Sequence, residues 1–323
     1  MNKVLIIQTA FIGDVILATP LIETLKANYP NCTIDFLVKK GNEELLFSNP
    51  LLSKVHVFDK SKKLASLFQN IRKIRKEKYD VVINLQRFAS SGIIAGLSAG
   101  KKIVGFTKNP MSFLFTEQFE HKIGNGQHEV DRNLSLIQSI CNVLIRRPKL
   151  YPSAEDFAKV NQFVKSPFIC LAPASVWKTK QAPIEKWIEV IRSHASEFMI
   201  YLVGAPSDYD LCEEIIQKSK HHSLVNLCGQ LKLIETAALF SKAHRVFVND
   251  SGPLHIASAM NTPVTAFFCS TTPEFGFGPL SDKSEVVEVK NLECRPCGLH
   301  GHKICPKGHF NCGNLLDVKK NNL

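Results

Sequence analysis

The chain reads Val-Phe-Val-Asn-Asp-Ser-Gly-Pro-Leu-His-Ile-Ala-Ser-Ala over residues 246–259. The apolar run stops at Asn249, and Pro253, a favoured first-turn residue, marks the start of a helix. A strand that leads into a helix through a short polar loop is the repeating unit of a parallel α/β sheet. The free N–H groups at the start of this helix favour phosphate binding, with His255 one turn further in. A capped helix with an incidental histidine is the alternative.

The same alternation of apolar strands and helices occurs in two series along the chain. In the first series, strands are expected at 3–8, 33–38, 55–58, 81–85 and 103–105, and helices at 15–28, 64–78 and 131–145. In the second, strands at 168–172, 199–203, 245–249, 264–268 and 286–289 alternate with helices at 185–194, 208–218 and 234–243. The stretch 146–167, which contains three prolines, is the best linker candidate. We therefore predict an α/β protein with two Rossmann-like domains, 1–150 and 168–312, facing across a cleft and followed by a tail at 313–323.

Length and composition are those of a folded, two-domain protein. The chain has 323 residues, which suits two domains at roughly 100–200 residues each. Hydrophobic residues make up 45% and charged residues 21%, so ordinary cores can form. No uncharged apolar run approaches the ~18 residues of a membrane span, and the first residues lead into a strand rather than a cleavable signal. Secreted, collagen-like, coiled-coil and integral membrane proteins are excluded, and a cytoplasmic location is expected.

The net charge of +11 is concentrated in the first half of the chain. Residues 1–150 contain 22 Lys and Arg against 12 Asp and Glu, whereas residues 151–323 contain 18 against 17. This asymmetry favours an anionic partner for the first domain, namely a phospholipid surface, a phosphorylated substrate or nucleic acid. Nucleic acid is disfavoured because the cations over 72–78 are not interleaved with aromatic residues for base stacking. A solvated basic surface is the alternative.

The loop after the first predicted strand reads Gln-Thr-Ala-Phe-Ile-Gly-Asp over residues 8–14. Ligands of open parallel sheets bind outside the carboxyl ends of the strands, so Asp14 is expected at such a crevice. A carboxylate beside a helix N-terminus stays ionised, which suits a general base and equally a helix cap. The G-x-G-x-x-G signature is absent, which argues against a nucleotide-sugar epimerase or dehydrogenase.

Two loops of the second series follow strands in the same way. The loop after 168–172 contains Ser175, Lys178 and Lys180, and its lysines can hold a polyanion by point charges or remain simply solvated. The loop after 199–203 contains Asp208. Its carboxylate can accept hydrogen bonds from ribose hydroxyls or cap the following helix.

Together these four loops resemble glycosyltransferase family 9, the ADP-heptose:lipopolysaccharide heptosyltransferases, over nearly the whole chain. The resemblance is strongest over residues 249–259. It also rests on Gly13, Asp14, Thr19, Pro20, Pro173, Lys180, Trp187, Gly204, Ala205, Pro206, Pro263, Phe267, Thr271 and Pro273. It implies the GT-B fold, in which the first Rossmann-like domain binds the acceptor and the second binds the nucleotide sugar.

The resemblance also implies roles for individual residues. Asp14 matches the catalytic base, and Lys180 matches the lysine that neutralises the donor diphosphate. Donor contacts are implied for Ser175 at the phosphate, Asp208 at the nucleoside, Leu231 at the adenine, and Asp250, Ser251, Gly252 and His255 in the donor loop. The family's Lys-Arg-Trp-Pro is here Lys-Gln-Ala-Pro, and its Pro-Gly-Ala is Pro-Ala-Ser, which leaves the lysine in place.

The implied reaction is an inverting, metal-independent transfer of a heptose from ADP-heptose to the inner core of lipopolysaccharide, with no cofactor required. The implied acceptor is an anionic lipid A–core glycolipid at the cytoplasmic face of the inner membrane, and no nucleic acid is expected. The cations that we expect near its entrance, and on the membrane surface, are Arg72, Lys73, Arg75, Lys76 and Lys78. Another nucleotide sugar or acceptor, or a basic nucleic-acid or zinc-binding module, are the competing interpretations.

Four of the ten cysteines, Cys294, Cys297, Cys305 and Cys312, fall within 19 residues that also contain three histidines. Thiolates or a Cys/His mixture can form a closed tetrahedral zinc site, but only the first pair has the C-x₂-C spacing. Reduced thiols or a local disulfide are favoured over a structural zinc. The segment is similar to a C-terminal stretch of family members that resemble heptosyltransferase II, and the resemblance implies no metal in catalysis.

Overall fold

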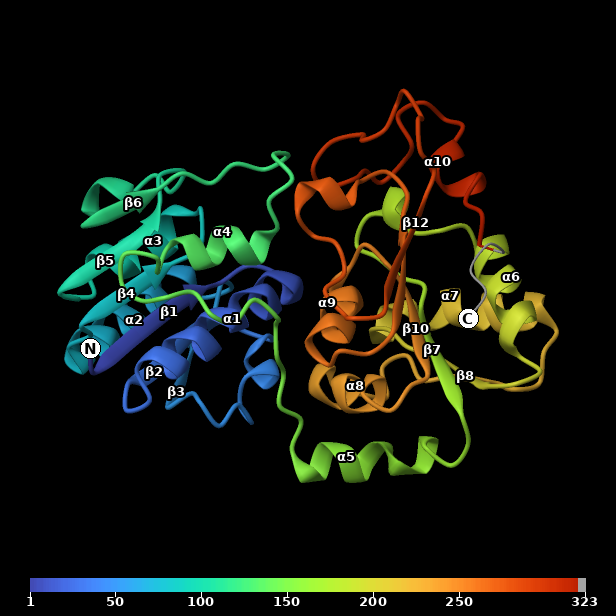
Figure 1. The fold of residues 1–323 in the computed structure, drawn as a ribbon, viewed down its shortest axis with the longest axis horizontal. Coiled ribbons are helices and arrows are strands. Elements are labelled where there is room, and N and C mark those ends of the chain that lie inside the picture. The colour runs from blue at the N-terminus through green and yellow to red at the C-terminus, as the bar shows by residue number, and fades with distance from the viewer. Residues whose placement is uncertain (319–323) are drawn as a thin grey trace. The chain divides into compact units, whose positions relative to one another are not determined.

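The computed structural model describes residues 1–318 and divides the chain into two compact units, Met1–Tyr151 and Pro152–Leu323 (Figure 1). Each unit is built on one six-stranded sheet, and every strand pair in both sheets is parallel. The predicted α/β class is therefore confirmed. No helix within residues 1–318 is both long enough and apolar enough to cross a bilayer.

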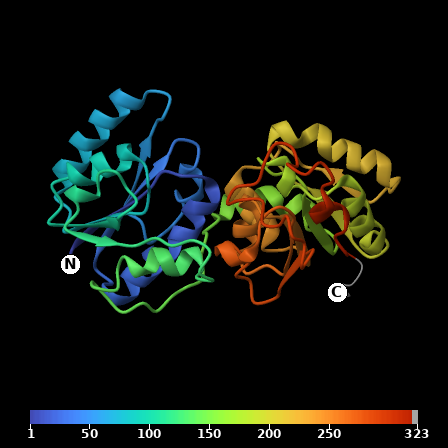
Figure 2. The same ribbon diagram turned by 90° about the horizontal axis from the view of Figure 1, so that it is seen from above.

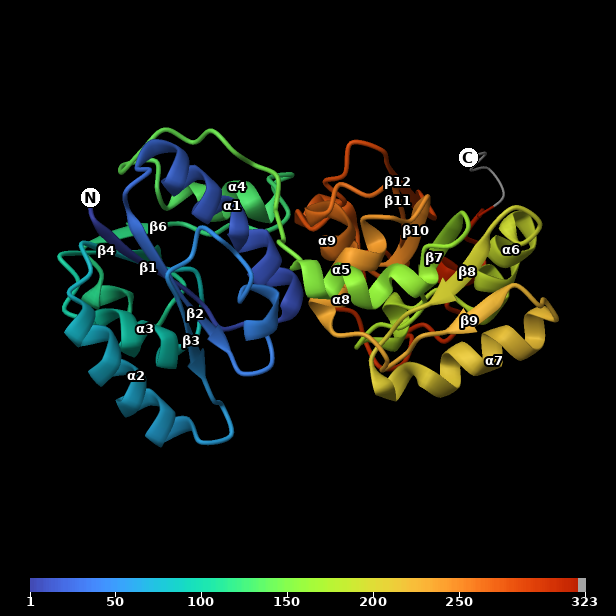
Figure 3. The ribbon, with the colours of Figure 1, turned by 90° about the horizontal axis from the view of Figure 1, so that it is seen from below.

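The sheet of the first unit has the strand order β3-β2-β1-β4-β5-β6. Its strands are β1 (Lys3–Gln8), β2 (Thr33–Lys39), β3 (Lys54–Phe58), β4 (Val81–Asn84), β5 (Lys102–Phe106) and β6 (Glu117–Phe119). The helices α1 (Ile12–Asn28) and α4 (Glu129–Ser135) cover one face, and α2 (Lys63–Glu77) and α3 (Ala89–Gly96) cover the other (Figures 2 and 3). Short 3-10 turns occur at Glu43–Leu45 and Ser112–Leu114. The central strand β1 is buried from Val4 onward, because helices cover both faces of the sheet.

Helix α1 passes through Pro20 without ending there. The proline ring removes the N–H that would bond to the carbonyl of Ile16. The hydroxyl of Thr19 donates to that same carbonyl at 2.8 Å and replaces the missing bond. The helix is therefore continuous through Pro20. It begins at Ile12, rather than at residue 15 as expected, so its first turn contains Asp14.

Helix α4 ends at Ser135, although the sequence pattern predicted a helix as far as residue 145. The chain beyond it continues in backbone turns as far as Cys141, whose N–H donates to the carbonyl of Ile137 at 2.9 Å. Two carbonyls at the end of these turns accept from side chains at the end of α1: Tyr29 Oη donates to the carbonyl of Ile140 at 2.7 Å, and Asn28 Nδ2 donates to that of Asn142 at 2.8 Å. Tertiary hydrogen bonds thus take the place of helical ones at Ile140 and Asn142.

The sheet of the second unit has the order β12-β11-β10-β7-β8-β9. Its strands are β7 (Phe168–Ala172), β8 (Met199–Leu202), β9 (Leu224–Asn226), β10 (Arg245–Asn249), β11 (Val264–Phe268) and β12 (Ser284–Glu288). One face carries α6 (Ile184–His194) and α7 (Tyr209–Ser219). The other carries α8 (Leu233–Phe240) and α9 (Gly252–Ala259), with α5 (Ala154–Val160) packed on α8 (Figure 1). The chain also forms α10 (Asn311–Asn314) and 3-10 turns at Asn161–Phe163, Lys178–Lys180, Pro206–Asp208 and Pro273–Phe275.

Two segments expected to lie outside the domains are folded. The stretch 146–167 includes the boundary between the units, and within it Ser153 caps α5: its Oγ accepts from the N–H of Asp156 at 3.2 Å. At the other end, Leu316 and Val318 are buried in the core of the second unit together with Trp187. Residues 313–318 therefore pack on this unit, and the rest of the expected tail, 319–323, lies outside the described residues.

The buried end of the chain makes a stability prediction. Leu316 is 1% exposed and its neighbour Leu315 is 60% exposed. Leu316→Ala should lower the free energy of unfolding of the second unit by about 2–5 kcal/mol through a core cavity, whereas Leu315→Ala should change it by less than ~0.5 kcal/mol. Urea unfolding followed by tryptophan fluorescence measures both, because Trp177 and Trp187 lie in this unit. Equal midpoints for the two variants would contradict the packing.

Candidate functional site

The carboxyl ends of the strands of the first sheet define an edge, here called the first carboxyl edge, at which Asp14 lies. β1 is the third strand of the sheet, with β2 and β3 on one side and β4 and β5 on the other. Its following loop carries Asp14 on the first turn of α1, where Oδ2 accepts from the N–H of Phe11 at 3.2 Å. The carboxylate therefore caps its helix and also lies where open parallel sheets bind ligands.

Cations follow the four strands that flank β1. Lys39 ends β2, and Lys60, Arg87 and Lys108 lie in the loops that follow β3, β4 and β5. Within residues 1–318 none of these four side chains forms an ion pair with a carboxylate. Because the strands are parallel, their loops collect at the first carboxyl edge, and four positive charges are therefore placed at the same edge as the carboxylate of Asp14.

Exposed aromatic rings contact three of these four cations. The ring of Phe88 has the ammonium of Lys60 at 5.8 Å and the guanidinium of Arg87 at 5.3 Å from its centroid. The ring of Phe11 has Lys39 Nζ at 5.5 Å. Phe11 and Phe88 are 68% and 51% exposed, so each ring steadies cations and also presents an apolar face to solvent.

The electrostatics of Asp14 are unusual for an aspartate. Burial raises its pKa from 3.8 to about 6, and the charge of Glu129 adds to that rise. Hydrogen bonds from the N–H groups of Phe11 and of Asp14 itself, together with Lys108, oppose it. A carboxylate with a pKa near 6 is charged at neutral pH and accepts a proton more readily than an ordinary aspartate, which suits a general base.

The basic cluster of α2 lies at the opposite edge of the first sheet. A helix that follows one parallel strand runs back toward the amino ends of the strands, and Glu77, the last residue of α2, pairs with Lys3 and Lys54 at the starts of β1 and β3. The expectation that the α2 cations lie near the acceptor entrance at Asp14 is therefore wrong. The misplaced residues are Arg72, Lys73, Arg75, Lys76 and Lys78.

In the second unit, the loop between β10 and α9 lies next to the ammonium of Lys180. Asp250 is 7% exposed, and its Oδ2 accepts from Thr271 Oγ1 at 2.6 Å and lies 2.6 Å from Lys180 Nζ. The ammonium is thus fixed next to the loop that begins α9 at Gly252. The free N–H groups and positive dipole end of a helix, with a cation beside them, suit a phosphate group.

A buried asparagine joins the two loops that carry these groups. Asn249 is fully buried at the end of β10; its Oδ1 accepts from the N–H of Ala182 at 2.9 Å, and its Nδ2 donates to the carbonyl of Pro173 at 2.7 Å. Both partners flank the loop that contains Ser175 and Lys180. Asn249 therefore fixes that loop against the start of α9, as the loss of either bond would leave a buried polar group unpaired.

The structure brings together only part of the predicted donor set. Ser251 precedes α9, Gly252 begins it, and His255 is 5% exposed on its first turns. Ser175 and Leu231 are half-buried in loops of the same unit. The carboxylate of Asp208 is turned back on its own loop, where Oδ2 accepts from the N–H of Ala205 at 2.8 Å, so it performs the capping role that the sequence left open.

The cysteine-rich segment packs on the Lys180 loop and its surroundings through its backbone. The N–H of His302 donates to Thr179 Oγ1 at 2.7 Å, and the N–H of Cys297 donates to the carbonyl of Ser270 at 2.9 Å. All ten cysteines are free thiols, and Cys294 Sγ lies 3.9 Å from His309 Nε2. Across residues 1–318 no three Cys, His, Asp or Glu side chains gather in a metal-binding group.

Sequence reasoning overlooked the residues that support the site rather than form it. No role was predicted for Asn249 or Thr271. None was predicted either for the four cations at the first carboxyl edge, which are Lys39, Lys60, Arg87 and Lys108. The signal for the cations is that each ends or follows a predicted strand by a few residues, as Asp14 does. Placing them side by side also requires the strand order, which local pattern does not supply.

Comparison with known proteins extends over both units. Residues 67–306 match the family model of glycosyltransferase family 9 (heptosyltransferase). The chain is 29% identical over 281 residues to lipopolysaccharide heptosyltransferase 3 of Escherichia coli, covering 81% of this chain and 82% of that protein. The structure of E. coli ADP-heptose lps heptosyltransferase II has a TM-score of 0.79 at 22% identity and covers 97% of this chain and 98% of that one. E. coli heptosyltransferase WaaC with ADP has a TM-score of 0.72 at 20% identity and covers 88% and 92%.

The raised pKa of Asp14 predicts a pH-dependent stability. Because the folded pKa of about 6 exceeds the ordinary 3.8, the folded state binds the proton more tightly, and wild-type stability falls as pH rises between those values. Asp14→Asn cannot ionise and escapes this loss. The free energy of unfolding of the variant minus that of wild type should therefore be larger at pH 7.5 than at pH 4, by on the order of 2 kcal/mol. Urea unfolding followed by circular dichroism at both pH values tests this, and an unchanged difference would mean an ordinary pKa.

Proposed function

We propose that this chain, which belongs to glycosyltransferase family 9, transfers a heptose from ADP-heptose to the inner core of lipopolysaccharide. Family membership makes it a glycosyltransferase with the GT-B fold. Its relative in E. coli is named a lipopolysaccharide heptosyltransferase, and the similar WaaC was solved with ADP. The observation that carries the proposal is the carboxylate of Asp14, with its raised pKa, at the same edge of the sheet as four cations.

The second unit supplies the donor site. Lys180 and the N–H groups at Gly252 offer positive charge where the diphosphate of ADP-heptose would bind, with the hydroxyl of Ser175 in the same loop as the lysine. Asp250 orients the ammonium and leaves its remaining N–H groups for phosphate oxygens. Charge that accumulates on the departing β-phosphate is stabilised by these fixed groups, so no metal ion or cofactor is required in this scheme. Leu231, Ser251 and His255 complete the proposed donor contacts, and Asp208, whose carboxylate caps its own turn, holds the loop that faces the nucleoside.

The first unit supplies the base. Asp14 takes the proton of the acceptor hydroxyl while that oxygen forms a bond to the anomeric carbon of the heptose. The bond from that carbon to the β-phosphate oxygen breaks, and ADP leaves with the electron pair from the opposite face. The anomeric configuration is therefore inverted. With a pKa near 6, Asp14 is ionised at neutral pH before the reaction, and after it has taken the hydroxyl proton it releases that proton to solvent.

The acceptor is anionic in this proposal. Lys39, Lys60, Arg87 and Lys108 are positioned to meet phosphate or carboxylate groups of a lipid A–core glycolipid whose hydroxyl lies at Asp14. The exposed cations of α2 lie at the other edge of the sheet, where they are available to the anionic inner leaflet at the cytoplasmic face of the membrane. The basic first half of the chain thus serves two separate surfaces.

A transfer assay tests the proposed function. ADP-heptose is incubated with the chain and a set of truncated core acceptors in EDTA, and mass spectrometry identifies any acceptor that gains a heptose. Asp14→Asn should bind ADP normally but lose at least ~10²-fold in kcat. A panel of other nucleotide sugars distinguishes the alternative of a family 9 enzyme with a different donor. Transfer only with added Mg²⁺ would contradict the metal-independent mechanism.

Lys180→Ala should raise the KM for the donor and lower kcat by roughly 10²-fold, because the ammonium acts on the bound diphosphate and more strongly as ADP departs. Lys178→Ala is the matched control: Lys178 belongs to the same 3-10 turn and is exposed. Its donor KM should stay at the wild-type value. Equal effects of the two variants would show that overall loop charge, rather than the Asp250-bound ammonium, matters.

Charge reversal separates the two basic surfaces. The triple variant Lys60→Glu, Arg87→Glu, Lys108→Glu should raise the acceptor KM, and more so at low ionic strength, while leaving the donor KM unchanged. The triple variant Arg72→Glu, Lys73→Glu, Arg75→Glu makes the same change in net charge on α2. It should weaken binding to anionic vesicles but leave the KM for a delipidated acceptor unchanged. If the α2 variant raises that KM as much as the first one, the proposed acceptor surface is incorrect.

A further inference from the structure

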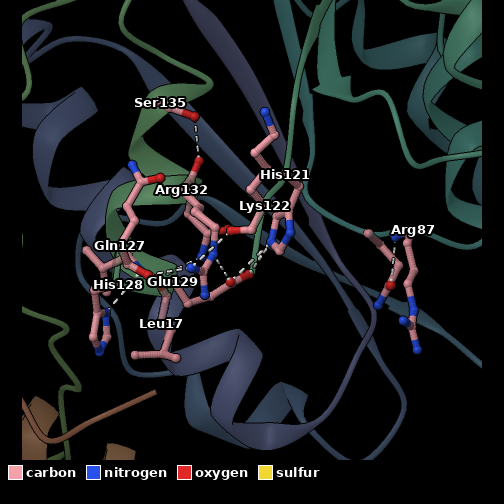
Figure 4. A network of polar contacts seen from close by, with 12 residues as sticks. Leu17, Arg87, His121, Lys122, Gln127, His128, Glu129, Arg132 and Ser135 are labelled. Atoms are coloured by element: carbon pink, nitrogen blue, oxygen red, sulfur yellow. Dashed lines mark hydrogen bonds and ion pairs between the residues drawn. The ribbon is translucent and has the colours of Figure 1, made fainter. Parts of the chain in front are cut away.

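The first unit contains a buried ion cluster that the reaction as described does not use. His121, Glu129 and Arg132 expose 2%, 9% and 1% of their side chains. The carboxylate of Glu129 accepts from His121 Nε2 at 3.0 and 3.1 Å and from Arg132 Nε at 2.7 Å (Figure 4). Arg132 also donates to the backbone carbonyls of Lys122 and Gln127. So many directed bonds leave the carboxylate little freedom to move.

Contacts with α1 place this cluster at the first turn of that helix. Asn133 Nδ2 donates to the carbonyl of Leu17 at 3.1 Å, and Tyr29 Oη donates to the carbonyl of Ile140. The chain from 133 to 140 therefore follows α1 from 17 to 29 in the same direction. Glu129 lies four residues before Asn133, about one helical turn. One turn before Leu17 on α1 is the start of that helix, so Glu129 is placed beside its first turn.

The carboxylate of Glu129 stays ionised in this position. Burial raises its pKa, but the hydrogen bonds and charges of His121 and Arg132 outweigh burial and bring the pKa below its ordinary value. Two donors thus fix a negative charge inside the unit. Such a charge persists through the pH range in which Asp14, with its pKa near 6, gains or loses its proton.

The charged groups that face Asp14 come from three directions. Glu129 from α4 disfavours its ionised form, whereas Lys108 from the loop after β5 favours it. Lys60, from the loop after β3, also interacts with the Asp14 carboxylate. Glu129 is the anion in this set. Like charges at short range make a carboxylate a stronger proton acceptor.

We propose that Glu129 is a positioning residue for the transfer reaction: clamped by His121 and Arg132, it holds a fixed negative charge beside Asp14 and strengthens that carboxylate as a proton acceptor. The inference rests on the proposed role of Asp14 as the base. Glu129 itself touches no reacting atom. The cluster therefore couples the docking of α4 on α1 to the basicity of the reacting group.

Glu129→Gln tests this, because the amide keeps the size of the side chain and an acceptor oxygen for Arg132 Nε, and removes the charge. The pKa of Asp14 is measured in the full-length protein by ¹³C NMR of labelled aspartate carboxyls, with Asp14→Asn to assign the signal. It should fall by roughly half a unit to one unit. The acid limb of the kcat/KM profile should move to lower pH by the same amount, and kcat at pH 8 should fall several-fold.

Glu120→Gln is the matched control, since Glu120 is an exposed carboxylate in the same segment, paired with Lys122. It should leave both the Asp14 titration and the pH profile at wild-type values. If Glu129→Gln does not fold, the test uses the double variant Glu129→Gln, Arg132→Gln, which removes both buried charges. An unshifted Asp14 pKa in a folded variant overturns the inference. The NMR titration needs no turnover, so absence of transferase activity in the wild type would reject the proposed function separately.

Discussion

Parallel pairing of all strands is the constraint on which the candidate site of each unit depends. In a parallel sheet every strand ends at the same edge, and each following helix presents its N-terminus there. This rule explains why Asp14, after β1, and Gly252, after β10, each lie at the carboxyl edge of their sheet. The two edges differ in what their loops carry: a carboxylate among cations in the first unit, and a cation beside a helix N-terminus in the second.

Supporting residues give each edge its chemistry. In the second unit, Asp250 holds the ammonium of Lys180, and Asn249 holds the loop that contains this lysine. In the first, the ring of Phe88 contacts two cations from different loops, and the charge of Glu129 contributes to the raised pKa of Asp14. In each unit, the position or the pKa of a candidate site residue is therefore set by neighbouring side chains.

The sequence predicted most of the strands and the positions of the candidate site residues at strand ends, because both depend on local pattern. Strands such as Phe168–Ala172 and Arg245–Asn249 match their predicted bounds, and Asp14 and Lys180 follow strands in the printed sequence. The errors are tertiary in origin. The helix expected over 131–145 stops at Ser135 and gives way to turns, whose later carbonyl at Ile140 accepts from the Tyr29 side chain. The α2 cations were expected near the acceptor on the basis of charge asymmetry alone. That expectation failed because charge asymmetry carries no information about the edge of the sheet at which a helix ends.

The hydrogen bond from His302 to Thr179 joins residues that are 123 positions apart in the chain. Contacts of such separation form late, because a long loop must close before they contribute. During synthesis, the turn that carries Lys180 leaves the ribosome well before the segment that braces it. This turn therefore gains its last supporting hydrogen bond only after the strands of the second sheet have been made.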